Sequence, residues 1–321
     1  MVLYLKEEIV KKLLTMRDCI QASEGAYRNF GEGKAVLTPR IDLWLDSTHS
    51  LKIGAAAVIG SGYMGTFSYS AGFGKKGTNP STTILYDATT GQLRALIQSL
   101  HLKWLRTGAT AALASKYLAR ENAKKVGIIG TGRQARTQLL GLSESRKISI
   151  VRVYSPTQEH RELFAKEMSD ELAIEVLAAD SARSCVSDAD IVVTCSTSKV
   201  PVFEHSWLSE GAHVSVIGAH TPTTREVDTE TVLRSKVVVE SREQALDENG
   251  NLLIPMKQRL FGPEKIFADL GEVISGKVRC RTSDSDNTLF LSGGVALDQM
   301  AIAERVYELA VQNGEGIDIP R

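Results

Sequence analysis

The 321-residue sequence is poor in cysteine and in aromatic residues, and it has no long apolar run. Its four cysteines, Cys19, Cys185, Cys195 and Cys280, are far apart and form no C-x-x-C pair. This spacing argues against a structural zinc site or a disulfide framework and fits a reducing compartment. No stretch approaches the ~20 apolar residues that span a bilayer. We therefore expect no metal site and a cytoplasmic location.

The net charge is zero, because the charges of the 38 basic and 38 acidic residues cancel. Nucleic acids and anionic membranes select basic surfaces, so neither partner is expected. The amino-terminal stretch MVLYLKEEIVKKLLT mixes charged with apolar residues, which predicts an amphipathic helix and not a signal peptide. With 43% hydrophobic and 24% charged residues, the composition is that of a globular protein large enough for two domains.

From residue 124 onward, short apolar runs alternate with helical stretches. The apolar runs are rich in β-branched residues and read VGIIG, ISIVRVYS, IEVLAA, DIVVTCS, HVSVIGA and KVVVES. Helical stretches such as RQARTQLLGLSES and TQEHRELFAKEMSDEL lie between them. This alternation predicts an α/β fold with a parallel sheet covered on both faces, the doubly wound Rossmann domain that binds dinucleotides.

The part of the chain before residue 124 has a different pattern. MRDCIQASEGAYRNFGEG predicts a helix, and β character separated by turns follows in IDLWL, KIGAAAVIG, TTILYD and RALIQSL, as in an antiparallel sheet. RTGATAALASKYLAR predicts a helix whose small residues allow close approach to a neighbour, and its position suggests that it joins two domains. GGVALDQMAIAERVYELAVQNG predicts an amphipathic terminal helix.

The run KVGIIGTGRQA has the layout of a strand, a glycine turn and a helix. Gly130 permits the tight turn, Gly132 lets the backbone approach a pyrophosphate, and Ala135 allows close packing of helix on strand. Arg133 and Gln134 begin the helix, whose amide groups attract negative charge. A glycine turn without a ligand is the alternative, but the strands that follow favour a bound dinucleotide.

The end of the second predicted strand modestly favours NADP over NAD. Ser155 stands where an NAD-binding protein usually has an acidic residue that holds the ribose hydroxyls. No carboxylate at this position would repel a 2′-phosphate, and Ser155, Thr157 and Arg161 can donate hydrogen bonds to one. Alternatively, Ser155 is only a turn residue and both cofactors are accepted.

Two further segments are expected to reach the cofactor. The run TCSTSKVPVF follows the fourth predicted strand, at the edge where open α/β sheets bind ligands, so Ser196 and Thr197 are candidates for cofactor contacts. Ser292 and Gly293 would return the chain to the nicotinamide end of the same cleft.

Five segments in this order make the chain resemble the ornithine cyclodeaminase and mu-crystallin family: LRTGATAALASKYLA, GIIGTGRQA, VIGAHTPTTREVD, FADLGEVISGK and LSGGVALDQMAIAERVYELA. The resemblance runs nearly end to end. It implies a nucleotide domain at 121–291, inserted into a discontinuous α+β substrate domain made of residues 1–120 and 292–321. It also implies a homodimer joined through the substrate domain, and hydride transfer between NAD(P) and a carbon that bears nitrogen beside a carboxylate.

The resemblance implies substrate-site residues as well. Arg40 in LTPRIDL and Arg106 in LRTGAT match two family arginines, and the planar guanidinium of arginine suits a carboxylate. Either arginine could instead form a surface ion pair. Thr107 is expected beside the cofactor, and Thr78 matches a family serine or threonine near the nicotinamide.

Two positions depart from the family pattern. Phe67 in MGTFSYS stands where relatives have a lysine that contacts the substrate. Either Lys75 or Lys76 supplies that cation, or the substrate is more apolar, or the alignment is shifted by a few residues. His220 in VIGAHTP stands where cyclodeaminases have an aspartate; a histidine there either acts as acid or base, or has no chemical role.

These features predict an NAD(P)-dependent oxidoreductase of a C–N bond, either an imino-acid reductase or an amino-acid dehydrogenase that acts on a small amino or imino acid. His220 is the candidate proton donor. The alternatives are a cyclodeaminase that uses NAD catalytically, and a nucleotide-binding protein without catalysis. Both departures from the family count against cyclodeamination and leave reduction open.

Overall fold

The computed structural model describes residues 2–73 and 79–320 and divides into two compact units. Unit 1 consists of Met1–Arg106 and Gly294–Arg321, and unit 2 of Thr107–Gly293. The first boundary falls inside helix α3 (Leu100–Leu118), so it precedes the boundary that we expected after residue 120. The second falls after Gly293, close to the expected end of the inserted domain at residue 291.

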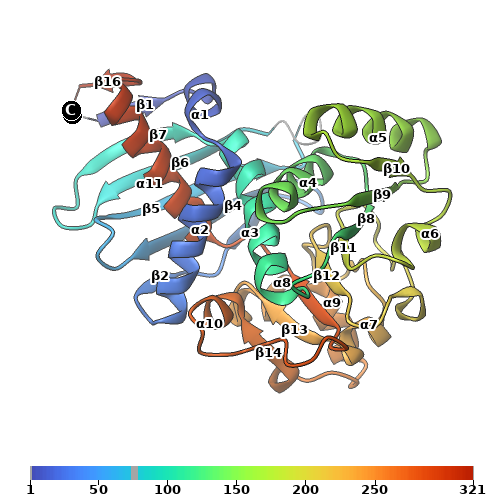
Figure 1. Cartoon of the computed structure of the whole chain (residues 1–321). Coiled ribbons are helices and arrows are strands. Elements are labelled where there is room, and N and C mark those ends of the chain that lie inside the picture. The colour runs from blue at the N-terminus through green and yellow to red at the C-terminus, as the bar shows by residue number, and fades with distance from the viewer. Residues whose placement is uncertain (1, 74–78, 321) are drawn as a thin grey trace. The chain divides into compact units, whose positions relative to one another are not determined.

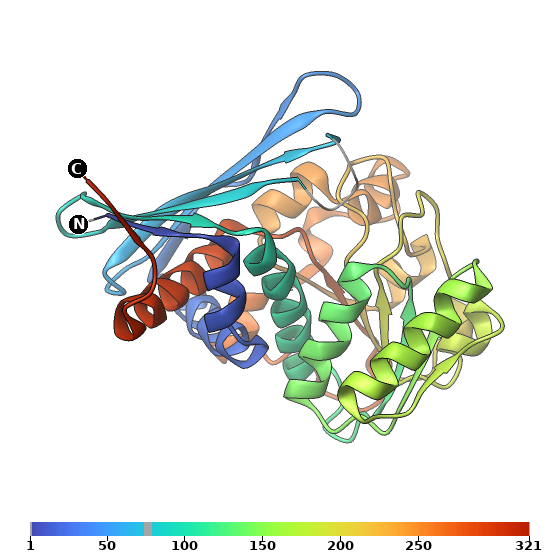
Figure 2. The ribbon, with the colours of Figure 1, turned by 90° about the horizontal axis from the view of Figure 1, so that it is seen from above.

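Unit 1 contains, among the described residues, an eight-stranded mixed sheet with helices on one face (Figure 2). The strand order is β16-β1-β7-β6-β5-β4-β2, and β3 also pairs with β4. The strands are β1 (Val2–Leu5), β2 (Ala35–Leu37), β3 (Ile41–Trp44), β4 (Ser50–Val58), β5 (Tyr63–Ala71), β6 (Ser81–Asp87), β7 (Leu93–Gln98) and β16 (Ile317–Ile319). The helices are α1 (Glu7–Leu13), α2 (Met16–Gly31), α11 (Ala296–Asn313) and the start of α3.

Two expectations for unit 1 were wrong in part. The amino-terminal stretch is not helical throughout, because Val2–Leu5 forms β1 and the helix begins only at Glu7. The sheet is not purely antiparallel, because β1 runs parallel to β7. Both differences have one cause. Residues 2–5 form hydrogen bonds with β7, which lies far along the chain, and this pairing outweighs the local helical pattern.

The inner face of this sheet packs on α2 and α11 because small residues alternate along its central strands. A Cβ atom on Gly65 would lie 2.2 Å from the carbonyl oxygen of Ile84 and 2.8 Å from Sδ of Met300 on α11, so only glycine permits this approach. α2 begins with a capping box, in which the Thr15 hydroxyl accepts a hydrogen bond from the Asp18 amide. The expected α2 and α11 are confirmed.

Unit 2 is the doubly wound Rossmann domain that the sequence predicts (Figure 1). Its sheet is parallel throughout, in the order β10-β9-β8-β11-β12-β15-β13-β14. The strands are β8 (Lys125–Ile129), β9 (Ile150–Tyr154), β10 (Val176–Ala178), β11 (Ile191–Thr194), β12 (His213–Val216), β13 (Lys236–Val239), β14 (Ile266–Asp269) and β15 (Thr288–Leu291). The helices are α4 (Arg133–Ser145), α5 (Gln158–Leu172), α6 (Ala182–Val186), α7 (Thr229–Arg234), α8 (Arg242–Glu248), α9 (Gly250–Lys257) and α10 (Leu270–Ile274).

The six expected strands are present, but β13 is not the neighbour of β12. The late strand β15 lies between them, pairing with β12 on one side and β13 on the other. β15 is only four residues long and buried throughout, so its sequence has no alternation that would distinguish it from other apolar runs.

Apolar clusters cover both faces of the unit 2 sheet. Ile191 and Val193 belong to one cluster and Val192 to the other, as alternation along a strand requires. The small-residue helix α3 approaches α4 closely, as expected, since a Cβ atom on Gly141 would lie 2.6 Å from the carbonyl oxygen of Gly108. Within residues 2–73 and 79–320, no helix has both the length and the apolar character needed to cross a membrane.

Candidate functional site

The turn after β8 contains two glycines that are required for different reasons. Gly130 has φ of 121°, and a Cβ atom there would lie 2.7 Å from the carbonyl oxygen of Cys195, so the fold itself demands glycine. Gly132 has an ordinary φ of −79°, and a Cβ atom there would meet nothing within 4 Å. The fold does not need glycine at Gly132, which leaves an open space in front of α4.

The amino terminus of α4 lacks a partner from its own cap. Gly132 is the N-cap residue and provides no side-chain hydrogen bond, and the first turn has no acidic residue. The amide groups of Arg133, Gln134 and Ala135 therefore start a 13-residue helix whose dipole favours an anion. Ala135 is fully buried, which allows α4 to pack closely. This open, uncapped turn fits the pyrophosphate of a dinucleotide.

Thr107 reaches this region through its backbone. Its carbonyl oxygen accepts a hydrogen bond of 3.1 Å from Nε2 of the buried Gln138 on α4. The bond joins the second half of α3 to α4 inside unit 2. Thr107 is itself buried, with 8% of its surface exposed.

The end of β9 carries a cation and hydroxyls. The Ser155 hydroxyl donates to the carbonyl oxygen of Thr157 at 3.1 Å, so it stabilises the turn. Nη1 of Arg161 donates to the carbonyl oxygen of Ser155 at 3.0 Å, and its guanidinium lies 5.6 Å from the centre of the Tyr154 ring. Thr157 is exposed and precedes α5 without capping it through its side chain.

A buried carboxylate, which the sequence analysis missed, connects the carboxyl ends of β11 and β12. Oε1 of Glu226 accepts hydrogen bonds from the Ser196 amide at 2.7 Å and the Ser196 hydroxyl at 2.6 Å. Oε2 accepts from the Thr194 hydroxyl at 3.0 Å and the Gly218 amide at 2.6 Å. Burial raises the pKa of Glu226, and these four hydrogen bonds oppose that rise. Ser196 is thus bound to Glu226, whereas Thr197 beside it is exposed.

His220 lies two residues beyond Gly218, in the loop after β12, and is exposed. Because Glu226 holds the Gly218 amide, the stem of this loop is anchored to the sheet. The structure therefore brings the Ser196 and His220 loops to the same edge of unit 2 through one carboxylate.

Ser292 and Gly293 are held by a second buried acid that was also missed. The Ser292 hydroxyl donates to Oε1 of Glu240 at 2.9 Å, and the Gly293 amide donates to Oε2 at 3.2 Å. A Cβ atom on Gly293 would lie 3.0 Å from Oε1 of Glu248. Glu240 directly follows the buried strand β13, and an acid at the carboxyl end of a buried strand is a signal that sequence reading could have used.

Arg106 in unit 1 is buried, with 4% of its surface exposed. Its Nη1 lies 3.7 Å from Oδ2 of Asp298, which is completely buried on α11. Gly294 has φ of 74°, and a Cβ atom there would lie 2.6 Å from Nη2 of Arg106. The guanidinium of Arg106 thus lies directly against the start of α11. Its ion pair with Asp298 is buried and does not lie on the surface. Asp298 lies on the buried face of α11, and an acidic residue at such a position could have indicated a buried cationic partner.

The other predicted substrate residues also lie in unit 1. Nε of Arg40 is 3.2 Å from Oδ1 of Asp42, which also pairs with Lys52. The Phe67 ring is buried and lies against Gly54, where a Cβ atom would be 2.5 Å from the ring. Thr78, Lys75 and Lys76 lie outside the described residues.

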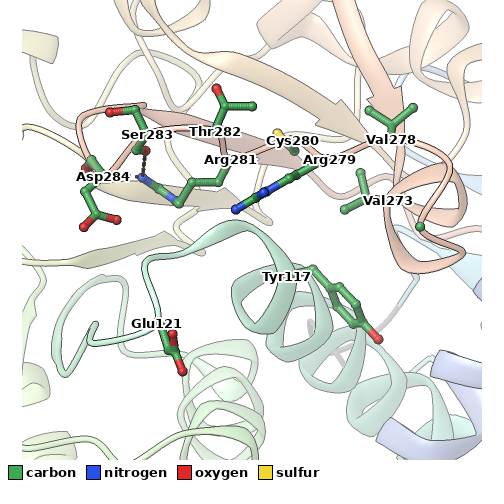
Figure 3. A pocket seen from close by; sticks show the side chains of 11 residues that line it. Tyr117, Glu121, Val273, Val278, Arg279, Cys280, Arg281, Thr282, Ser283 and Asp284 are labelled. Carbon is green, nitrogen blue, oxygen red and sulfur yellow. Dashed lines mark hydrogen bonds between the residues drawn. The ribbon is translucent and has the colours of Figure 1, made fainter.

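A cavity of about 590 Å³ in unit 2 contains none of the predicted site residues (Figure 3). It lies where strands begin, because its wall includes Tyr117 before β8 and Arg281 before β15. The Arg281 guanidinium donates hydrogen bonds to the carbonyl oxygens of Leu118 at 2.8 Å and Gly211 at 3.1 Å. These bonds stabilise the fold. Open α/β sheets bind ligands at the opposite edge.

Among the described residues, no group of three or more His, Cys, Asp or Glu side chains could hold a metal ion.

Known proteins resemble the chain over most or all of its length. A Delta(1)-pyrroline-2-carboxylate reductase of Bacillus thuringiensis is 38% identical over 244 residues, 76% of this chain and 74% of the relative. An alanine dehydrogenase of Archaeoglobus fulgidus is 33% identical over 320 residues, 99% of this chain and 98% of the relative. The solved structure of Thermococcus litoralis Delta(1)-pyrroline-2-carboxylate reductase, in complex with NADH and L-proline, has a TM-score of 0.94 and 33% identity, and covers 99% of this chain and 100% of that one. Residues 2–314 match the model of one family, and the chain belongs to it: the ornithine cyclodeaminase/mu-crystallin family.

Proposed function

We propose that this enzyme, an NAD(P)-dependent oxidoreductase of C–N bonds, reduces a cyclic 2-imino acid to the corresponding amino acid. The observation that carries the proposal is the open space at Gly132 before the uncapped start of α4, which suits a dinucleotide pyrophosphate. The choice of a cyclic imino acid is supported by the pyrroline-2-carboxylate reductases among the relatives.

The residues of unit 2 are assigned to the cofactor. When bound, the nicotinamide dinucleotide supplies the hydride. The first amides of α4 hold its pyrophosphate, and Thr157 and Arg161 at the end of β9 hold the ribose end. We assign a modest preference for NADP to the cation and hydroxyls found there, while the solved relatives contain NAD or NADH. We also assign Thr107, Thr197, Ser292 and Gly293 to the cofactor contacts.

The residues of unit 1 are assigned to the substrate carboxylate. Arg106 lies 3.7 Å from Asp298, and its planar guanidinium suits a carboxylate, so we assign it to the substrate carboxylate. His220, which belongs to unit 2, is assigned as the proton donor to the nitrogen. An imine needs little beyond orientation and a positive environment, so this sparse set of groups suffices.

A homodimer is part of the proposal. The face of the unit 1 sheet turned away from α11 has large apolar side chains that are 37–61% exposed: Val36, Ile41, Leu43, Leu51 and Met64. Register aligns Leu43 with Leu51 and Ile41 with Ile53, so these side chains form one continuous surface. Such a surface marks an interface, and a relative of known structure is described as a dimer.

The four buried free thiols support a cytoplasmic location.

Cofactor oxidation tests the proposed function. The purified enzyme is mixed with NADH or NADPH and either Δ1-pyrroline-2-carboxylate or pyruvate with ammonia, and absorbance is followed. We expect fast oxidation with the cyclic imine and formation of proline. Oxidation only with pyruvate and ammonia would instead indicate an alanine dehydrogenase. Conversion of ornithine to proline and ammonia without net change in NADH would indicate a cyclodeaminase, and cofactor binding without any turnover would indicate a binding protein.

A further inference from the structure

We propose that unit 2 binds a nucleoside phosphate in two adjoining cavities at the edge of its sheet where the strands begin. This second site is distinct from the proposed cofactor site, which lies where the strands end, at the start of α4. Its ligand takes no part in the proposed reduction, so this site goes beyond the proposed function.

The two cavities meet at Glu121, which lines both of them. The first is the cavity of about 590 Å³ shown in Figure 3, and the second has a volume of about 440 Å³. The second lies beside the ends of α3 and α4, at Lys116 and Ser145, and before the start of β8. Both volumes are within the range of roughly 300–1,000 Å³ that is typical of ligand pockets.

The second cavity has an excess of positive charge, although the whole chain is neutral. Of its eight lining residues, Glu121 is acidic and four are basic: Lys116, Lys124, Arg146 and Lys147. The side chains of Lys124 and Lys147 are exposed, and neither has a hydrogen-bond or ion-pair partner within residues 2–73 and 79–320. Phosphate groups are the anions that such a cluster of ammonium groups suits.

Arg146 adds a charge that no carboxylate of the described residues neutralises within ion-pair distance. Its Nη1 donates to the carbonyl oxygen of Arg120 at 3.0 Å, and its Nη2 to the carbonyl oxygen of Ser115 at 2.6 Å. Burial lowers the pKa of Arg146, and the positive charge of Arg281 lowers it further. A bound anion would relieve this repulsion between cations.

The first cavity is balanced in charge and offers flat and apolar surfaces instead. Its two arginines, Arg279 and Arg281, are matched in number by the acids Glu121 and Asp284. The Tyr117 ring comes from α3, whereas three other lining side chains come from α10 and the segment after it (Figure 3): Val273, Val278 and Arg279. Aromatic rings and guanidinium planes are the groups on which nucleic-acid bases stack.

The loop of residues 280–286, which supplies part of the first cavity, is fixed by its own hydrogen bonds. Oδ2 of Asp286 accepts from the amides of Thr282 and Ser283, each at 2.8 Å. The ammonium of Lys236 on β13 donates to the same oxygen at 2.8 Å. A wall that is already ordered reduces the entropy lost when a ligand binds.

Glu121 favours a nucleoside phosphate over a bare inorganic anion. Its exposed carboxylate lies between the two cavities, where it would repel a polyanion. A carboxylate accepts hydrogen bonds from ribose hydroxyls, as it does in NAD-binding domains. The order of base, ribose and phosphate therefore corresponds to the first cavity, Glu121 and the second cavity.

Calorimetric titration with ATP, without magnesium, tests the site. The enzyme first receives one equivalent of NADH, whose fluorescence reports on the cofactor site during the titration. We expect ATP to bind while the fluorescence of bound NADH is retained. Loss of that fluorescence in step with ATP binding would mean that ATP enters the cofactor site, and an absence of ATP binding would equally refute the second site.

A double variant removes the lysines of the second cavity. Lys124→Met combined with Lys147→Met should lower the affinity for ATP about tenfold. The control, Lys166→Met combined with Lys257→Met, removes two exposed lysines of α5 and α9 and should bind ATP as wild type. Equal losses in both double variants would attribute binding to net charge alone and contradict the site. All variants are titrated with and without NADH, so the result does not depend on the proposed reduction.

Glu121→Ala tests the class of ligand by comparing ATP with inorganic tripolyphosphate. We expect this variant to bind ATP about fivefold more weakly, because a partner of the ribose is lost. It should bind tripolyphosphate more tightly, because a repulsive charge is removed. Tighter binding of both ligands by the variant would rule out the nucleoside, as would a wild-type enzyme that binds tripolyphosphate as tightly as ATP. Melting temperatures verify that each variant is folded.

Discussion

The residue proposed to face the cofactor and the residue that the fold requires lie next to each other in the turn after β8. Gly130 is demanded by its backbone conformation and by contact with Cys195. Gly132 has neither requirement, so a ligand is the remaining reason for a glycine there. A substitution at Gly132 therefore separates binding from stability.

Gly132→Ser should change stability and cofactor affinity in opposite directions. Serine is a better N-cap than glycine by a few tenths of a kcal/mol, so the free energy of unfolding without ligand should be unchanged or slightly higher. The new hydroxyl occupies both the open space and an amide of α4, so the Kd for NADH should rise about tenfold or more. Denaturant unfolding and fluorescence titration measure the two effects. Wild-type affinity in this variant would show that no phosphate binds at the turn.

A substitution of Glu226 tests whether its hydrogen bonds hold the loops after β11 and β12 in place. Each of its oxygens accepts one backbone amide, from Ser196 and from Gly218, so either orientation of a glutamine would direct its own NH2 at an N–H donor. Glu226→Gln should therefore lower the free energy of unfolding by about 1–3 kcal/mol. The exposed Glu204→Gln is the control in the same denaturant experiment. Equal stability of the two variants would mean that the four hydrogen bonds contribute little.

At the scale of elements, α3 combines two tasks along one helix. Its first turns belong to unit 1 and contain Lys103 and Arg106, and its later turns belong to unit 2 and approach α4 at Gly108 and Gly141. The small residues of its later turns could be interpreted from sequence, because close packing of helices requires them. The surroundings of its first turns could not be predicted, because Lys103 contacts Tyr69 and Arg106 pairs with Asp298, residues that lie on other elements.

α11 carries a carboxyl group that makes stability depend on pH. Burial raises the pKa of Glu304 from 4.5 to about 7, and neighbouring Glu308 adds to the rise. The folded protein therefore keeps a proton that the unfolded chain releases between pH 4.5 and 7, so the free energy of unfolding should fall as pH rises through this window.

Glu304→Gln should remove this part of the pH dependence. The variant should melt at a higher temperature than wild type at pH 8, where the half-buried carboxylate is ionised, and nearly at the wild-type temperature at pH 5. Melting curves from pH 5 to 8 measure this, with the exposed Glu171→Gln as control. A variant that follows the wild-type curve would show that Glu304 titrates normally.

At the level of the whole molecule, the proposed homodimer would bury the apolar outer face of the unit 1 sheet. Leu43 is 57% exposed on the short strand β3, and a lysine there should make the protein monomeric because a charge cannot be buried unpaired in the interface. Light scattering after gel filtration measures the mass. As control, Leu163→Lys changes a residue that is 54% exposed on α5 of unit 2 and should leave the dimer intact. A dimeric Leu43→Lys variant would place the interface elsewhere.

Features that arise from neighbouring residues could be predicted from the amino-acid sequence alone. The period of apolar residues predicted α4, α5 and the six strands of unit 2, and the glycine turn predicted where α4 begins, because helices, strands and turns depend on local spacing. The ordered motifs then indicated the family and its C–N chemistry, which the relatives support.

Contacts between residues that are distant in sequence became apparent only in the folded chain. β15 lies between β12 and β13, Asp298 pairs with Arg106, Glu226 joins two loops, and Lys103 lies over Tyr69. None of these follows from local spacing, because each depends on chain segments that are far apart in sequence and are brought together by burial of apolar surface. Phe67 departs from the family pattern in the sequence, and the fold shows its ring buried and stacked on Tyr69.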